Sequence, residues 1–127
     1  MIRLLGSIFA VAMLATGTLT TTAPAADKFD GAWSVVVITD AGTCDRAYRY
    51  GVRIENGKVH YAGGDAGGPV QISGTVAANG RVAVSVRSGD RVAKGSGRLT
   101  GDSGAGRWSG QSSADRCSGR WEAERRG

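Results

Sequence analysis

The stretch Cys117-Ser118-Gly119-Arg120-Trp121-Glu122-Ala123-Glu124-Arg125 lies at the end of the chain and alternates between two kinds of residue. One parity holds the cysteine, a glycine, the tryptophan and the alanine, and the other holds serine, arginine and two glutamates. A period of two with one polar face is typical of a half-buried β-strand. Because Trp121 needs a core that a terminal strand cannot supply, the stretch predicts a last strand that pairs with an earlier segment.

The rest of the chain after residue 25 is also organised in short alternating runs, and none of it shows a helical period with caps. The many glycines would weaken a helix further. Alternation predicts earlier strands at about residues 31–39, 48–55, 59–61, 70–76, 81–87, 91–99 and 106–110. Eight short strands at regular spacing predict an all-β fold, an eight-stranded antiparallel up-and-down β-barrel, with a small β-sandwich as the alternative.

Turn sequences separate these runs. Asn56-Gly57 and Asn79-Gly80 both favour type I′ hairpin turns, because both residues of each pair tolerate a positive φ. The glycine-rich residues 62–68 predict a flexible loop, and residues 101–104 predict a turn. Such short connections favour strands that pair in chain order.

Closing this meander places the last strand antiparallel to the first. Cys117 then begins the last strand near Cys44, which follows the first, while Arg125 comes near Trp33 at the opposite end. The guanidinium of Arg125 can lie over the Trp33 ring; the alternative is a frayed, solvated Arg125. Trp33, Trp121 and Arg125 are therefore predicted to close the barrel structurally.

The start of the chain has the pattern of a secretory signal peptide. Arg3 precedes an apolar run over residues 4–15, and Ala23-Pro24-Ala25 fits a cleavage site. The run is shorter than the ~20 residues of a membrane-spanning helix, which disfavours an anchor. We predict a signal peptide over residues 1–25 and a single β-barrel domain over residues 26–127, with no transmembrane segment after cleavage. Loss of Arg3 lowers the net charge from +5 to +4.

Export affects how the cysteines are interpreted. The chain has two, Cys44 and Cys117, and an even count in an oxidising compartment predicts a disulfide between them. A bridge over so long a loop is expected to add about 3–5 kcal/mol of stability. The predicted location is periplasmic or secreted.

Two ends of the chain resemble the calycin pattern of lipocalins and avidins. Gly31-Ala32-Trp33 supplies the Gly-x-Trp motif that opens the first strand of that superfamily, and Arg125 supplies the late arginine that packs across the tryptophan. The chain also resembles small secreted bacterial proteins of unknown function. That second likeness rests on residues 31–35, Cys44-Asp45-x-x-Tyr48-Arg49-Tyr50, residues 97–101 and residues 117–125. The resemblance implies a β-barrel fold and no particular activity.

Enzyme chemistry finds little support in these residues. The only histidine, His60, lies on the polar parity of a short strand, and a metal site needs several converging ligands. The carboxylates are scattered through turns and outer faces, so none pairs for general acid–base work. We predict no enzyme, no catalytic residue, no metal and no cofactor.

Binding is the better hypothesis, and aromatic residues carry it. Tyr48, Tyr50, Tyr61 and Trp108 fall on predicted inward faces and are the candidate ligand-lining residues. In an eight-stranded barrel such side chains can also fill the core. Glycines on the same faces either admit the rings of Trp108 and Trp121 or leave a space: Gly95, Gly97, Gly106, Gly110 and Gly119.

Two functions follow from this pattern. The first is an exported, non-enzymatic barrel that binds a small ligand or an acidic envelope polymer, which suits the arginines and lysines of the outer faces. The alternative is a protein-interaction module, such as an inhibitor of a secreted hydrolase. A cavity lined by tyrosines favours the first, and a packed interior with a protruding 62–68 loop favours the second. Nucleic acid is not predicted as a partner, because no stacking array lies on an exposed face.

Overall fold

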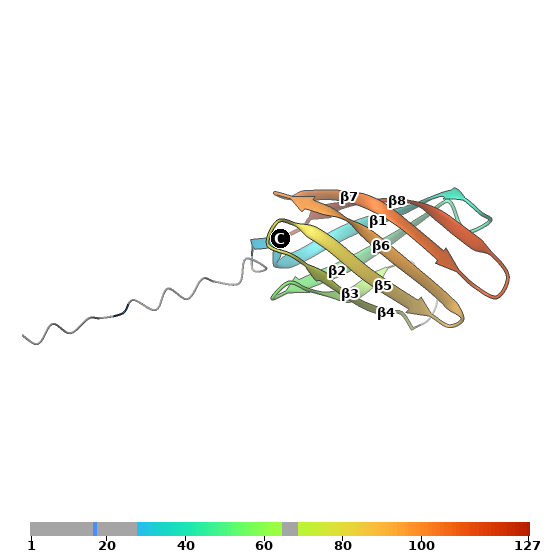
Figure 1. Ribbon diagram of the computed structural model, residues 1–127, viewed down its shortest axis with the longest axis horizontal. Coiled ribbons are helices and arrows are strands. Elements are labelled where there is room, and N and C mark those ends of the chain that lie inside the picture. The colour runs from blue at the N-terminus through green and yellow to red at the C-terminus, as the bar shows by residue number, and fades with distance from the viewer. Residues whose placement is uncertain (1–16, 18–27, 65–68) are drawn as a thin grey trace, which may run out of the picture.

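The computed structural model describes Gly17, residues 28–64 and residues 69–127. Apart from Gly17, the predicted signal peptide lies outside the described residues. Eight antiparallel strands form a closed barrel in chain order (Figure 1), which confirms the predicted barrel over the sandwich. The strands are β1 (Gly31–Ala41), β2 (Ala47–Glu55), β3 (Lys58–Gly64), β4 (Gln71–Val76), β5 (Arg81–Ser88), β6 (Arg91–Thr100), β7 (Ser103–Gln111) and β8 (Arg116–Arg125).

The glycine-rich strands are longer than predicted. β3 runs to Gly64 and so takes in the first part of the expected 62–68 loop, of which residues 65–68 lie outside the described chain. β7 begins at Ser103, so the turn before it is shorter than residues 101–104. Both predictions were wrong because glycines have no side chains whose alternation could reveal a strand.

One of the two predicted type I′ turns is confirmed. Asn56 and Gly57 have φ values of 51° and 72°, and the Asp30 carboxylate accepts hydrogen bonds from both of their amides at 2.8 and 3.3 Å. The prediction for Asn79-Gly80 was wrong, because Gly80 has a positive φ of 86° and Asn79 does not. Gly80 N donates to Ala77 O at 2.9 Å, as in a type I turn followed by a left-handed glycine.

The seam between β1 and β8 closes the barrel as predicted. Trp33 lies opposite Arg125 and Val37 lies opposite Trp121. A register shift follows Thr39, near the start of β8. The stretch from Cys117 to Arg125 therefore has β1 on one side and β7 on the other.

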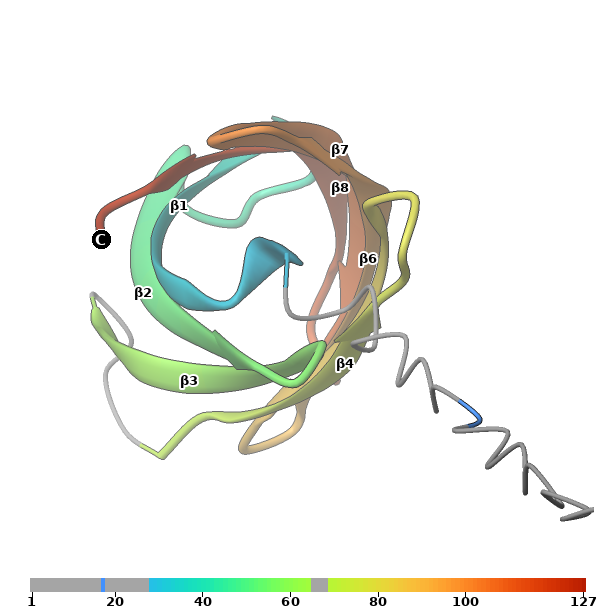
Figure 2. The ribbon, with the colours of Figure 1, turned by 90° about the vertical axis from the view of Figure 1, so that its left-hand side faces the viewer.

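One end of the barrel, called here the closed end, contains most of the core. Phe29 and Trp33 are each 2% exposed, and the short 3₁₀ turn that carries Phe29 lies across the mouth of the barrel (Figure 2). Side chains from six strands pack with them: Val52, Ile54, Val59, Val76, Val82, Leu99, Trp121 and Ala123. This packing fills the closed end.

Arg125 fastens this end of the seam. Its guanidinium lies 4.7 Å from the centre of the Trp33 ring, which confirms the stack and excludes the frayed alternative. The same side chain donates to Asp30 O at 2.7 Å and to Lys28 O at 3.0 Å. Trp33 Nε1 donates to Phe29 O at 2.9 Å. Arg125 and Trp33 thus hold the plugging segment in place together.

The seam between β3 and β4 differs from the others. Among the described residues, these two strands pair only at Lys58 and Thr75, whereas β4 and β5 pair along six positions. On its other side, β3 pairs with β2 along most of its length, with a register shift between Tyr50 and Val52. Among the described residues, the barrel wall therefore has the fewest ladder pairs between β3, which carries Tyr61, and β4.

Candidate functional site: a cavity at the open end

A cavity of about 820 Å³ extends inward from the other end of the barrel, the open end, and its lining includes core residues such as Trp33, Ile54 and Leu99. Its size lies within the range of small-molecule sites, about 300–1,000 Å³. Apolar side chains from four strands form much of its wall: Val35, Val37, Val52, Ile72, Val84 and Val86. Val35, Val37, Ile72 and Val84 are only partly buried, because the side chains that face them do not reach across the space.

Trp121 forms part of the cavity floor. Its indole lies over two glycines of neighbouring strands, since a Cβ on Gly97 or Gly106 would come within 2.5 or 2.6 Å of the ring. Trp121 Nε1 donates to Ser96 O at 3.1 Å, which fixes the ring across β7. The glycines therefore admit Trp121 at this level, and space remains nearer the open end.

Three of the four predicted lining residues reach the cavity. Tyr48, Tyr50 and Trp108 line it, and Tyr61 does not. The rings of Tyr48 and Tyr50 are stacked with centroids 6.1 Å apart, and Tyr61 lies edge-on to Tyr50 at the same distance. Tyr61 therefore belongs to the tyrosine array but supports Tyr50 from beside it, next to the sparsely paired β3–β4 seam.

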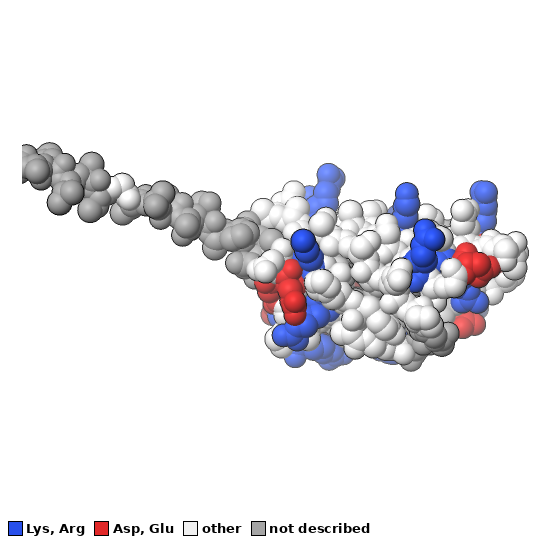
Figure 3. Space-filling model, turned by 90° about the horizontal axis from the view of Figure 1, so that it is seen from below, with Lys and Arg blue, Asp and Glu red and all other residues white. Residues whose placement is uncertain are grey.

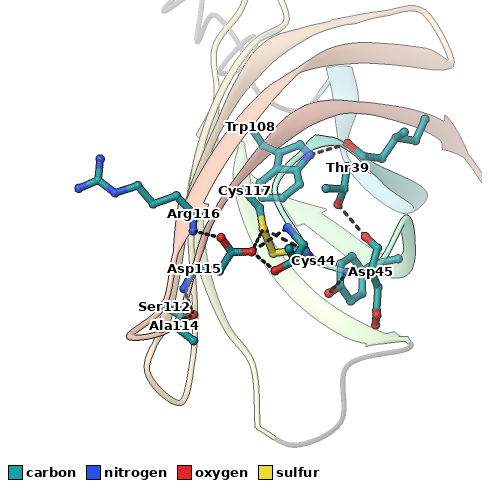
Figure 4. Close-up of a disulfide and its surroundings, with 12 residues drawn as sticks. Thr39, Cys44, Asp45, Trp108, Ser112, Ala114, Asp115, Arg116 and Cys117 are labelled. Atoms are coloured by element: carbon teal, nitrogen blue, oxygen red, sulfur yellow. Dashed lines mark hydrogen bonds between the residues drawn. A yellow bond between two sulfur atoms is a disulfide. The ribbon is translucent and has the colours of Figure 1, made fainter.

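Trp108 is held at the cavity wall by a hydrogen bond that no sequence pattern indicated. Its strand position lies opposite Gly119 in β8. Trp108 Nε1 donates to Ile38 O in β1 at 2.9 Å (Figure 4). Because Gly119 has no side chain, the indole can reach across β8 to the bond. The ring is thus positioned before any ligand arrives.

The disulfide lies at the rim of the cavity. Cys44 and Cys117 are joined with an S–S distance of 2.01 Å, which confirms the predicted bridge, and Cys44 lines the cavity. Beside it, Asp115 accepts a hydrogen bond from Thr43 N at 2.7 Å and another from the Thr43 hydroxyl (Figure 4). The hydroxyl bond, with smaller contributions from backbone amides, lowers the pKa of Asp115.

A second carboxylate joins the next pair of loops. Asp90 accepts hydrogen bonds from Ser113 Oγ at 2.6 Å and from Ser113 N at 3.2 Å, and the hydroxyl bond chiefly lowers the pKa of Asp90. Asp90, Ser113, Asp115, Thr43 and the disulfide connect three open-end loops and are called here the collar. The sequence predicted the disulfide but not the two carboxylate contacts, because Asp90 and Ser113, like Thr43 and Asp115, are far apart in the chain.

Two places in the described chain carry residue types that can bind metals or transfer protons. Cys44, Asp115 and Cys117 have potential metal-ligating atoms within 4.8 Å of one another, but both sulfurs are engaged in the disulfide and offer no thiolate. His60 is exposed on the outer face, opposite Arg53. Neither group adds a reactive centre to the cavity.

Comparison of the chain with protein-family models, with curated proteins and with solved structures finds no match. In the part of the chain that the structure describes, no helix is long and apolar enough to span a membrane.

Proposed function

We propose that this protein is an exported, non-enzymatic barrel that holds a small, largely apolar molecule in the open-end cavity. One observation carries the proposal: a space of about 820 Å³, open at one end, is lined mainly by apolar side chains that do not fill it. Burial of apolar surface contributes about 25 cal/mol per Å². A guest that covers the partly buried Val35, Ile72 and Val84 would gain this contribution.

The lining also defines the shape of the guest. One wall carries the Tyr48 and Tyr50 rings, and the rim adds polar groups, among them Asp45, Arg91 and Gln111. A compact molecule with an apolar body and one polar end fits this distribution, with the polar end at the rim. Convergent polar groups at one side of an apolar pocket are typical of sites that orient a ligand.

Other features agree with this proposal. A disulfide is typical of exported proteins, which supports a periplasmic or extracellular location. The stack of Arg125 on Trp33 agrees with a calycin-like kinship, which stays a prediction. A hydrolase inhibitor also remains a prediction, but its expected signature was a packed interior, and the cavity favours the ligand carrier.

The test is binding of a neutral apolar fluorophore, N-phenyl-1-naphthylamine, to the purified barrel. We expect enhanced fluorescence that saturates at one molecule per chain. Val86→Trp would fill part of the cavity, because Val86 lines it, and should abolish the signal. Ser85→Trp is the matched control: it lies next in the chain, faces outward and should bind as the parent does.

Native mass spectrometry of protein from an oxidising expression compartment provides a second readout. A co-purifying small molecule that Val86→Trp excludes would support the proposal. Equal fluorophore binding by the parent and both variants would place the probe on the surface and contradict it. So would a parent protein that binds neither the fluorophore nor a co-purifying molecule.

A further inference from the structure

The outside of the barrel has a second depression, on the other side of the cavity wall; Val84, Lys94, Gly95 and Trp108 line both. It lies over β4 to β7 and is called here the outer groove. Its lining includes five residues with hydroxyl groups: Ser73, Thr75, Ser85, Ser96 and Ser109. It also includes the small apolar Ala83 and two basic residues, Lys94 and Arg107. Each hydroxyl can both donate and accept a hydrogen bond, so the floor suits a ligand rich in polar groups.

Basic side chains surround this floor without acidic partners. Arg81, Arg87, Lys94, Arg98 and Arg107 are exposed, and none of them takes part in the salt bridges found in the described chain. The outward positions of β4 to β7 carry no carboxylate, because the acidic residues of this region, Asp90 and Asp102, lie in turns. On the face in Figure 3, acidic side chains likewise lie toward the ends of the barrel.

Two pairs of arginines lie directly opposite each other across neighbouring strands, and the second pair includes Arg120 of β8. Arg81 pairs with Arg98, and Arg107 pairs with Arg120. Like charges in directly opposed positions destabilise a sheet. Of these four, Arg120 is compensated by Asp40 at 2.9 Å. The remaining cations keep an unbalanced positive field that an anionic ligand would neutralise.

Three of the cations are evenly spaced. The register places Ser85 opposite Lys94 and Ser96 opposite Arg107. From Arg87 to Lys94 to Arg107, each step therefore crosses one strand and moves two residues along it. With strands ~4.8 Å apart and a rise of ~3.4 Å per residue, each step spans roughly 8 Å. An even series of cations fits a linear ligand with repeating negative charges.

We propose that the outer groove binds an anionic polysaccharide. The hydroxyl floor matches the hydroxyl groups of sugars, and the Arg87–Lys94–Arg107 diagonal matches their carboxylate or sulfate groups. Single-stranded nucleic acid would need several exposed aromatic rings for stacking. The one aromatic residue in the groove lining is Trp108, whose ring also lines the cavity and is held by its hydrogen bond to Ile38 O. A protein partner would need large apolar or aromatic anchors, and the exposed part of the groove lining offers only the small apolar side chain of Ala83.

The first experiment measures binding of a heparin-derived octasaccharide to the full barrel at 0.15 M salt, where the screening length is about 8 Å. The triple variant Arg87→Gln, Lys94→Gln, Arg107→Gln should bind on the order of tenfold more weakly, since each exposed ion pair contributes up to ~1 kcal/mol. The control Arg46→Gln, Arg53→Gln, Arg126→Gln removes the same charge from exposed positions outside the groove and should change the affinity less than twofold. Equal weakening by both triples would show attraction to net charge alone and overturn the proposal.

A second pair of variants separates this site from the cavity and leaves the charge unchanged. Ser85→Trp places a ring on the groove floor and should weaken octasaccharide binding at least tenfold, while Val86→Trp faces inward and should leave it unchanged. Circular dichroism confirms that each variant keeps the barrel. Loss of binding in Val86→Trp with retention in Ser85→Trp would overturn the proposal. Tighter binding to phosphatidylglycerol vesicles or to single-stranded DNA than to the octasaccharide would also overturn it.

Discussion

Arg125 joins segments that lie at opposite ends of the chain. Its guanidinium covers the Trp33 ring at 4.7 Å, donates to carbonyls of Lys28 and Asp30, and pairs with Asp102 at 2.8 Å. The side chain is 21% exposed, so these contacts are partly shielded from water. The planar guanidinium can stack on a ring and donate several hydrogen bonds at once, which explains why an arginine occupies this position.

Replacing Arg125 by lysine tests the importance of this geometry. Arg125→Lys keeps the charge but loses the fork and the planar stack, so we expect a loss of about 2 kcal/mol in the free energy of unfolding. Arg126→Lys is the control, because the Arg126 side chain is 61% exposed. Urea unfolding followed by tryptophan fluorescence measures both. Equal stability of the two variants would contradict a closing role for Arg125.

A second prediction concerns the glycines beneath Trp121. A Cβ at Gly106 would lie 2.0 Å from Ser96 O and 2.6 Å from the Trp121 ring, so Gly106→Ala should cost about 1–3 kcal/mol by overpacking. At Gly51 the nearest atom would be 3.5 Å away, and Gly51→Ala should leave the stability nearly unchanged. Thermal unfolding of the two variants provides the comparison. A stable Gly106→Ala protein would show that Trp121 can move aside.

These residues also show where sequence reasoning succeeds. The contact of Trp33 with Arg125 was predictable, because barrel closure and strand parity together bring the two positions side by side. The position of Trp121 over Gly97 and Gly106 was not, since the same glycines were compatible with an empty space. Choosing between the two needs the ring rotamer, which depends on the hydrogen bond to Ser96 O.

Among the elements, the open-end loops are tied by two carboxylates. Asp115 accepts from Thr43 and Asp90 accepts from Ser113. Hydroxyl donors lower the pKa of both carboxyl groups from the ordinary value of 3.8. A lowered pKa in the folded state means that the stabilisation is fully present above the unfolded pKa. It is lost as the pH falls through the lower, folded pKa.

The collar therefore predicts acid sensitivity. We expect the melting temperature to fall as the pH is lowered below about 4, partly because Asp90 and Asp115 must then take up protons. The variant Asp90→Asn, Asp115→Asn has no carboxyl group to protonate at these positions. Its melting temperature should therefore fall less steeply below about pH 4. Asp45→Asn is the control, because the hydrogen bonds found for Asp45 use its backbone. Parallel pH profiles for all three proteins would contradict the role of the collar.

The strands differ in how well their sequences revealed them. β2 and β5 alternate apolar and polar residues clearly, and their predicted boundaries lie within a residue of those observed. β3 ends in a glycine-rich segment and β7 begins in one. In such segments backbone pairing decides where the strand ends, and side-chain alternation gives no signal. The turn at Asn79 was likewise set by the pairing of Gly80 O with Leu99 N at 2.8 Å, which the local sequence does not contain.

For the whole molecule, the disulfide connects the two ends of the strand order. Cys44 and Cys117 are 73 residues apart, and the chain-entropy model assigns about 4 kcal/mol to a loop of this length. The variant Cys44→Ser, Cys117→Ser should lose a comparable amount in guanidinium unfolding, with the barrel still formed. Unchanged stability would mean that hydrogen bonds alone fasten the β1–β8 seam.

The overall fold was predictable and the cavity was not. Strand number, pairing order and closure follow from alternation and short turns, and the disulfide agrees with that closure. Whether Val84 and Val86 meet other side chains or enclose a space depends on the width of the barrel. Strand tilt and stagger set that width, and neither can be read from strand sequences. Tyr61 shows the same limit, because its parity is inward but its ring packs beside Tyr50.

The single ladder pair between the described parts of β3 and β4 predicts where the barrel opens most easily. The opposite seam is restrained by a covalent bond and by Arg125. Local opening should therefore concentrate on the β3–β4 side, where the described strands form one ladder pair, Lys58 with Thr75, next to the hydrogen bond from Val76 N to Gly57 O. Segments with few ladder bonds open at low free-energy cost and exchange their amide hydrogens fastest. We expect the amides of Tyr61 and Ile72 to exchange much faster than those of Val35 and Trp121. A guest would then enter sideways between these strands, and its residence time would follow the rate at which this wall opens.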